Sequence, residues 1–256
     1  MKKSEVMIYR ITSRSNPKVK ELLKEKDNYF IFEGEKLVRD ILQRDMKISK
    51  LIINNREEGK LNISGKSIHE IWYVHEQVLR KISSLKESAD FLAVLKIKKR
   101  KINLNKARIV IGIHDVQDPG NVGTIFRCAA AFGIDSIALT GASVNPNNSR
   151  FLRAAQTSFL EVDFQEFEDV ETLIKKAKAK NYHIYLTSAG FPGEENPVPM
   201  DEVHFPCVII FGNEGQGLKE ALFTRFPMLR IPQNKDVESL NVGVSACIIM
   251  YAITKS

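Results

Sequence analysis

The sequence predicts an α/β protein of two domains, the second of which holds a parallel β-sheet covered by helices on both faces. The chain has 256 residues, of which 43% are apolar. This is enough for a buried core, and at about 100–200 residues per domain the length fits two moderate domains. In residues 108–254, short apolar runs alternate with helical patterns, as in a sheet buried on both sides.

The charge changes sign along the chain. Residues 1–106 contain 25 Lys and Arg against 14 Asp and Glu, whereas residues 107–256 contain 13 against 17. A solvated surface explains any single lysine. A whole segment with a net charge of +11 also lowers the cost of approaching a polyanion and gains from the release of its counterions. Nucleic acid is the partner that this asymmetry predicts.

The first domain is expected to be a small α/β layer. A helix starts at Ser15-Asn16-Pro17, where a capping residue precedes a proline, and Val19, Leu22 and Leu23 give it an apolar stripe. Other apolar patterns predict strands at 29–32, 48–53, 71–74 and 91–97 and helices at about 35–43 and 75–83. The charged run KIKKRKINLNK at 96–106 is typical of an interdomain connection, although phosphate contact is an alternative. We place the boundary near residue 103.

The second domain is expected to alternate strands and helices. Its apolar patterns predict strands at 109–113, 136–140, 182–187 and 207–211 and helices at about 121–132, 169–179, 218–224 and 241–254. In parallel sheets the ligand crevice lies beyond the carboxyl ends of the strands. Segments rich in Gly, Asn and Ser fall at these ends, so we expect the functional site there.

Several classes of protein are excluded. No stretch approaches the roughly 18 apolar residues of a membrane-spanning helix. Neither domain has a Gly-x-Gly-x-x-Gly turn after its first strand, none of the five His belongs to a metal motif, and no Gly-x-Ser-x-Gly elbow occurs. We therefore expect no membrane partner, no metal site, and neither dinucleotide nor acyl chemistry.

The cysteines suggest a reducing compartment. Cys128, Cys207 and Cys247 are far apart in sequence and form no chelating motif, so we expect each to be a small buried apolar side chain. The basic start of the chain lacks the apolar run of a signal peptide. These observations predict a cytoplasmic protein.

Three polar segments that contain glycine carry the candidate chemistry. In the first, Pro119-Gly120 supplies a turn, Asn121 is expected to cap a helix, and Arg127 follows six residues later among apolar neighbours. A charged Arg on so apolar a helix is costly unless it is paired or meets a ligand phosphate or carboxylate. For this residue a salt bridge and a functional role are both open.

The other two segments follow apolar runs. Gly212-Asn213-Glu214-Gly215-Gln216-Gly217 has three glycines that expose its backbone, with an acid among them. Ile231-Pro232 leads on to Ser239-Leu240-Asn241, which precedes an apolar helix. Taken alone, Ser239 and Asn241 are adequately explained as helix caps.

Together these segments resemble the three motifs of the SpoU (TrmH) family of RNA ribose 2'-O-methyltransferases. The motifs are Asn-x-Gly with Arg six residues after the Asn, Gly-x-Glu-Gly-x-Gly, and Ile-Pro followed by Ser-Leu-Asn-Val, and the match covers residues 108–254. The start SRSNPKVKELL and the segment FIFEGEKLV resemble the ribosomal-protein-like substrate-binding domain that precedes the catalytic part in many members.

The resemblance implies a fold, a cofactor and partners. Residues 104–256 would be a SPOUT methyltransferase domain, a parallel sheet with a C-terminal trefoil knot that holds S-adenosylmethionine. Residues 1–103 would be an RNA-binding substrate domain. The family also implies a homodimer through the methyltransferase domain, with its active site at the subunit interface. The implied substrate is rRNA or tRNA, with rRNA favoured.

The resemblance also implies roles for individual residues. The catalytic or RNA-contacting positions are Asn121, Arg127, Glu214, Ser239 and Asn241. The cofactor-binding positions are Thr187, Ser188, Ala189, Gly212, Asn213, Gly217, Ile231 and Leu240. The candidate RNA contacts are Arg14, Lys18, Lys20 and Arg153, for each of which an ordinary helix surface is the alternative. The chain departs from the family at Ala155-Gln156-Thr157, where many relatives have Ser-Met-Gly, and at Gly243, where Ser is frequent.

The expected reaction moves a methyl group onto a ribose 2'-oxygen. A guanidinium is a poor base because its pKa is above about 12, so we expect Arg127 to bind phosphate and to stabilise the developing alkoxide. Two alternatives remain open. One is a noncatalytic RNA-binding or ribosome-associated protein that keeps the fold, and the other is methylation of a base rather than ribose.

Overall fold

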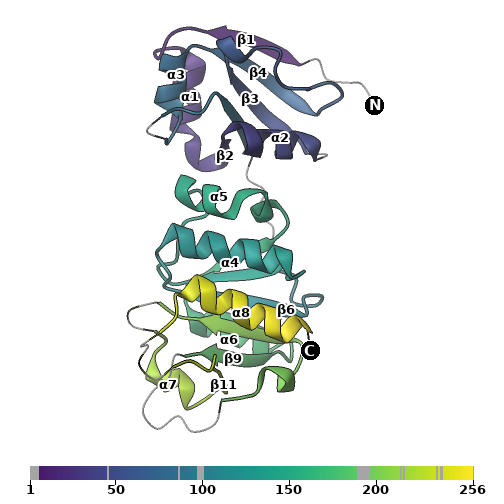
Figure 1. Ribbon diagram of the computed structural model, residues 1–256, viewed down its shortest axis with the longest axis vertical. Coiled ribbons are helices and arrows are strands. Elements are labelled where there is room, and N and C mark those ends of the chain that lie inside the picture. Colours follow the sequence, from purple (N-terminus) through teal and green to yellow (C-terminus); the bar gives the residue numbers. More distant parts are fainter. Residues whose placement is uncertain are drawn as a thin grey trace. The chain divides into compact units, whose positions relative to one another are not determined.

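The computed structural model describes residues 6–44, 46–85, 87–96, 101–188, 197–213, 215, 217–234, 236 and 239–255. The chain divides into two compact units, Met1–Lys98 and Lys99–Ser256. Each unit contains one β-sheet with helices packed on it (Figure 1). Among the described residues, no helix is both long and apolar enough to cross a membrane.

The first unit is built on a mixed sheet. Its elements are β1 (Met7–Ile11), α1 (Pro17–Lys24), β2 (Tyr29–Glu33), α2 (Glu35–Gln43), β3 (Ile48–Asn54), β4 (Ile68–Val74), α3 (Glu76–Ile82) and β5 (Phe91–Lys96), with 3-10 turns at Lys26–Asn28 and Asn55–Glu57. The strand order is β1-β4-β3-β5-β2, in which β1, β4 and β3 are parallel and β5 is antiparallel to both neighbours. Val19 of α1 and Leu79 of α3 pack with Trp72 in one core. The predicted elements are present, and the end of the 91–97 strand, Ile97, lies outside the described residues.

The second unit is built on a six-stranded parallel sheet. Its elements are β6 (Ile109–His114), α4 (Pro119–Ala131), β7 (Ser136–Thr140), α5 (Ser149–Ala155), β8 (Asp163–Phe167), α6 (Val170–Lys178), β9 (His183–Thr187), β10 (Cys207–Phe211), α7 (Glu220–Phe223), β11 (Met228–Leu229) and α8 (Val242–Lys255), with 3-10 turns at Gln156–Leu160 and Met200–Glu202. The strand order is β11-β9-β10-β6-β7-β8, and every pair is parallel. The parallel sheet expected from the apolar runs is confirmed.

The central strands of this sheet are buried on both faces. Val110 and Val208 pack with Leu173 of α6 in one core cluster, while the intervening Ile111 and Ile209 are equally buried and point to the opposite face because side chains alternate along a strand. Helices α4 and α8 pack against each other and lie side by side in Figure 1. Because β9, β10 and β6 are parallel neighbours in the sheet, their carboxyl ends lie close together at the same end of the sheet.

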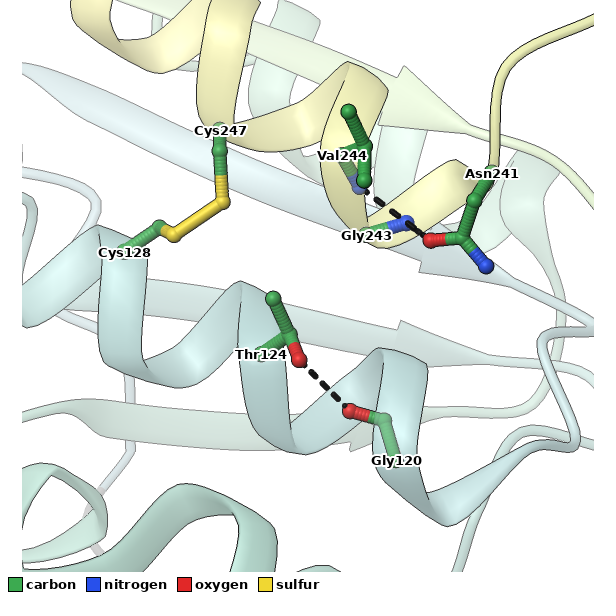
Figure 2. Close-up of a disulfide and its surroundings, with 7 residues drawn as sticks. All are labelled: Gly120, Thr124, Cys128, Asn241, Gly243, Val244 and Cys247. Atoms are coloured by element: carbon green, nitrogen blue, oxygen red, sulfur yellow. Dashed lines mark hydrogen bonds between the residues drawn. A yellow bond between two sulfur atoms is a disulfide. The ribbon is translucent and has the colours of Figure 1, made fainter.

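The expectation of three isolated cysteines is wrong for two of them. Cys128 of α4 and Cys247 of α8 form a disulfide, with their Cα atoms 5.5 Å apart (Figure 2). Both side chains are half-buried, whereas Cys207 is a free, buried thiol, as expected. The two partners are separated by 119 residues, so only the packing of α4 on α8 brings them together.

The elements that sequence patterns missed are short or little buried. In β1 only Ile11 is buried, and in β8 only Phe167 is, so neither strand shows the alternation that marks one. Helix α5 and strand β11 contain seven and two residues respectively. Segments this short carry too little periodicity to be recognised before their packing is known.

Candidate active site

A cavity of about 250 Å³ opens beyond the carboxyl ends of β9, β10 and β11, which are neighbours in the sheet. Its described lining residues are Thr187, Ser188, Phe211, Gly212, Asn213, Gly215, Gly217, Leu218, Phe223, Ile231, Gln233, Ser239, Leu240, Val242, Ser245 and Ile249. They include the second and third polar segments and the residues that follow β9. No ionisable acidic or basic side chain is among these described residues, so the part of the wall that they form consists of apolar groups and neutral dipoles.

One wall of the cavity is a loop that turns back on itself after β10. A Cβ atom at Gly212 would lie 2.7 Å from the carbonyl carbon of Gly217 and 2.8 Å from the backbone nitrogen of Leu218. The backbone N–H of Gly217 donates to the carbonyl of Asn213 (2.9 Å), and Gly217 adopts a positive φ of 63°. Only glycine fits at Gly212, because the contacting atoms are backbone atoms that cannot rotate away.

Another wall comes from helix α8, which sequence reasoning did not assign to the site. Val242, Ser245 and Ile249 line the cavity, and their spacing of three and four residues places them on one face of the helix. An apolar stripe at this spacing is indistinguishable in sequence from an ordinary core face. Its only distinctive feature is the polar Ser245 within it.

Two motif residues that lie 120 positions apart meet beside the cavity. The side-chain Nδ2 of Asn241 donates to Oδ1 of Asn121 (2.9 Å). Oδ1 of Asn241 accepts from the backbone N–H of Gly243 (2.9 Å) and of Val244 (3.2 Å), so Asn241 also caps α8 (Figure 2). The first and third motifs are therefore joined directly by this hydrogen bond.

The cap of helix α4 differs from the one expected. Asp118 is the N-cap, and its Oδ1 accepts from the backbone N–H of Asn121 (2.8 Å). Pro119 occupies the first helical position, where its missing N–H costs nothing. Asn121 thus lies within the first turn, and its side chain is available to Asn241.

Arg127 is exposed, so the expected cost of a buried charge does not apply. Helix α4 buries Val122, Ile125 and Phe126, while Arg127 lies on the solvent side. Within the described part of the chain no hydrogen bond or ion pair involves this side chain, and it is not among the described cavity residues.

The remaining candidate residues are placed as follows. Arg14 donates from Nε to the carbonyl of Gln77 (2.9 Å), Lys18 lies over the ring of Tyr9, and Lys20 is exposed. Arg153 is half-buried on α5 and outside the described cavity lining. Glu214 and Ala189 lie outside the described residues.

Two family models match parts of this chain. The model of the SpoU rRNA Methylase family matches residues 108–251, and an MRM3-like substrate binding domain matches residues 16–93. The first match contains the cavity and all three motifs.

Relatives and solved structures extend over nearly the whole chain. The 23S rRNA (guanosine(2553)-2'-O)-methyltransferase RlmP of Bacillus subtilis is 30% identical, over 94% of this chain and 97% of its own. The AdoMet-bound rRNA methyltransferase of Sinorhizobium meliloti is 25% identical with a TM-score of 0.77, covering 97% of this chain and 98% of its own. The SpoU methyltransferase AviRb of Streptomyces viridochromogenes, 16% identical with a TM-score of 0.76 over 94% and 97% of the two chains, shares the fold. With the family model matched across the cavity and its motifs, the chain belongs to the SpoU rRNA methylase family.

Proposed function

We propose that the chain transfers a methyl group from S-adenosylmethionine to a ribose 2'-hydroxyl of RNA, with rRNA favoured over tRNA. The observation that carries the proposal is one cavity lined by the residues after β9, the loop after β10 and the third motif, in a chain of this family. The relative RlmP is named for a 2'-O-methylation of 23S rRNA, and the S. meliloti structure contains AdoMet.

The residues of the cavity fit the cofactor. The absence of a Cβ at Gly212 lets the backbone of Gly217 and Leu218 pack against it, which shapes a cavity wall of exposed backbone. Phe211, Leu218 and Ile249 offer apolar contact to a flat ring. Thr187, Ser188, Gly212, Asn213, Gly217, Ile231 and Leu240 are the described residues that we assign to cofactor binding, with Ala189 as the further position. When bound, the cofactor supplies an electrophilic methyl group.

The chain's own contribution is to orient the ribose and to stabilise charge. Asn121 and Asn241, held together at 2.9 Å, and Ser239 at the cavity are assigned to the ribose. Holding two reactants near attack distance lowers the barrier by about 7–11 kcal/mol. Arg127 binds the flanking phosphate and stabilises the developing alkoxide as the 2'-oxygen releases its proton to bulk water. Glu214 is assigned to fix Arg127 or a loop.

The exposure of Arg127 supports a homodimer through the methyltransferase domain. Val244, Ile248 and Tyr251 of α8 are exposed by 46, 41 and 53%, and their spacing puts them on one stripe of the helix that packs beside α4. We propose that a second copy covers this stripe and contributes its own Arg127 to the cavity. The family fold also implies a trefoil knot, which remains a prediction.

RNA recognition is assigned mainly to residues 1–103, with residues 104–256 as the methyltransferase domain. The excess of basic residues in the N-terminal region and the match of residues 16–93 to a substrate binding domain support the assignment. Arg14, Lys18, Lys20 and, in the second unit, Arg153 are the proposed phosphate contacts. The proposed location is the cytoplasm, where Cys128 and Cys247 are expected as thiols that form the disulfide only on oxidation.

Two measurements test the function. Calorimetry with S-adenosylmethionine is expected to show binding, and its absence would favour the noncatalytic RNA-binding alternative. Ribosomal RNA from a deletion strain, methylated by the purified protein and then hydrolysed with alkali, is expected to yield a resistant dinucleotide. Complete hydrolysis of RNA that has gained a methyl group would instead indicate methylation of a base.

A further inference from the structure

Asp115, directly after β6, has a backbone conformation that is unfavourable for its side chain. Its φ is +57°, in the left-handed region that costs most residues other than glycine free energy and that Asp and Asn tolerate best. The residue follows the central strand of the second sheet, between β10 on one side and β7 on the other. Such strain persists only where surrounding contacts maintain it.

The contact on the β10 side is made to the wall of the cavity. The side-chain Nδ2 of Asn213 donates to the carbonyl oxygen of Asp115 (2.8 Å). Oδ1 of the same Asn213 accepts from the backbone N–H of Gly215 (2.7 Å), and Asn213 and Gly217 form an isolated β-bridge. One side chain therefore organises the loop of Gly212, Asn213, Gly215 and Gly217 internally and ties it to the end of β6.

The contacts on the β7 side hold Asp115 itself. Its Oδ1 accepts from the backbone N–H of Ala142 (2.7 Å), and its Oδ2 lies 3.1 Å from Nε2 of His114. His114 is buried and bonds through Nδ1 to Oγ1 of Thr140 (2.9 Å). The carboxylate of Asp115 is thus held by Ala142, which follows β7, and by His114 at the end of β6, which is itself bonded to Thr140 of β7. These contacts maintain its backbone in the left-handed conformation.

The direction of the Asp115 carbonyl follows from this conformation. A change of φ at Asp115 to the ordinary extended region would turn the peptide plane and move the carbonyl away from Asn213. The loop after β10 would then keep its internal bonds but lose its tie to the central strand. Gly212 would stay next to Phe211, which is paired with Ile113 of β6, but the loop from Asn213 onward would lose its fixed position relative to β6.

We propose that Asp115 is a positioning residue for the cofactor loop, which its left-handed backbone holds through the hydrogen bond from Asn213. The inference rests on the proposed function, because it takes the cavity as the site of S-adenosylmethionine. Asp115 acts through Asn213 and does not line the described cavity. The bond orders the loop before the cofactor arrives, which lowers the entropy cost of binding.

Calorimetry with S-adenosylmethionine on the full chain tests this role with two variants of Asp115. Asp115→Asn keeps tolerance of positive φ and an oxygen for Ala142, so its affinity is expected to stay within about threefold of wild type. Asp115→Val, which resists positive φ, is expected to lose affinity by about tenfold or more, the effect of one well-formed hydrogen bond and the order it imposes. At saturating cofactor its kcat is expected to change less than its cofactor KM.

A double-mutant cycle separates positioning from general damage. Asn213→Asp replaces the donor to Asp115 by an acceptor while keeping an oxygen for Gly215, and it is expected to lose affinity by about tenfold or more. In the double variant Asp115→Val, Asn213→Asp, the fold-loss of cofactor affinity should be well below the product of the two single fold-losses, since both changes break the same bond.

Each result has a defined meaning. Equal affinities of Asp115→Val and Asp115→Asn, or losses that multiply in the double variant, would overturn the inference alone. Failure of the wild type to bind would overturn the proposed function and the inference with it. If Asp115→Val does not fold, as judged by circular dichroism, Asn213→Asp decides, and unchanged affinity there overturns the role of the bond.

Discussion

The disulfide between Cys128 and Cys247 is expected to stabilise the second unit by restricting its unfolded state. The two cysteines are 119 residues apart, and their Cα atoms are separated by 5.5 Å in the fold. Helices α4 and α8 also hold each other through the bond from Asn241 to Asn121 (2.9 Å). Replacing both cysteines by serine therefore leaves the folded packing in place and acts mainly on the entropy of the unfolded chain.

The size of the effect follows from the length of the closed loop. For a separation of 119 residues, the chain-entropy relation gives about 16 cal/mol/K, or about 5 kcal/mol at 25 °C. The stabilisation measured for disulfides is commonly about 2–4 kcal/mol. With a urea dependence of about 2 kcal/mol per molar, the unfolding midpoint of the second unit is expected to fall by about 1–2 M in the double serine variant.

The first unit supplies an internal reference for the assay. It contains the one tryptophan of the chain, Trp72, which is fully buried, and none of the three cysteines. Urea unfolding of oxidised protein is followed on the same samples by tryptophan fluorescence and by far-UV circular dichroism. The fluorescence midpoint is expected to be unchanged in the variant, while the dichroism change that belongs to the second unit moves to lower urea.

Reduction provides the matched control. In the presence of a phosphine reductant, wild type and the double serine variant are expected to unfold at the same urea concentration. If mass spectrometry confirms the linkage and the oxidised wild type still unfolds at the midpoint of the variant, the loop-entropy reasoning is refuted. A shift of the fluorescence transition alone would refute the assignment of the effect to the second unit.

Three further predictions concern the site and the thiols. Arg127→Lys is expected to bind S-adenosylmethionine like wild type but to lose about a hundredfold in kcat. A lysine cannot reproduce the planar, bidentate hydrogen bonding of a guanidinium. Near-normal turnover would rule out the proposed role of Arg127. Gly212→Ala is expected to abolish cofactor binding, since its Cβ would lie 2.7 Å from a backbone carbon, whereas Gly215→Ala, with only a side-chain oxygen at 3.3 Å, retains binding in the same calorimetric assay. Burial raises the pKa of the Cys207 thiol to about 12. Iodoacetamide at pH 8 should therefore label no cysteine in the oxidised native protein and one cysteine after denaturation. Labelling of the native protein would contradict the burial of Cys207.

The strands and helices of the core could be predicted because their patterns are local. The runs at 109–113 and 207–211 are almost wholly apolar and only five residues long. A continuous apolar run of this length is typical of a strand buried on both faces. The polar segments after these strands predicted the edge of the sheet at which the cavity lies. Of the three polar segments, the second and third contribute residues to the described cavity lining, and the first reaches it through the bond between Asn241 and Asn121.

The details of the site depended on contacts between segments far apart in the chain. The bond from Asn241 to Asn121, the disulfide of Cys128, and the place of Ser245 on the cavity wall leave no local signature. The exposure of Arg127 was misjudged for the same reason, since composition does not say which side of a helix is covered.

Sequence alone thus determined the fold class and the central strands and helices of the sheet, because side-chain periodicity and backbone preference act over a few residues. Only the tertiary structure decided which atoms of those segments meet, because that depends on how the strands are ordered and on which helix faces pack. Asp115 illustrates the division: nothing in its neighbours predicts a positive φ, and its contacts with Ala142 and Asn213 exist only once β7, β6 and β10 lie side by side.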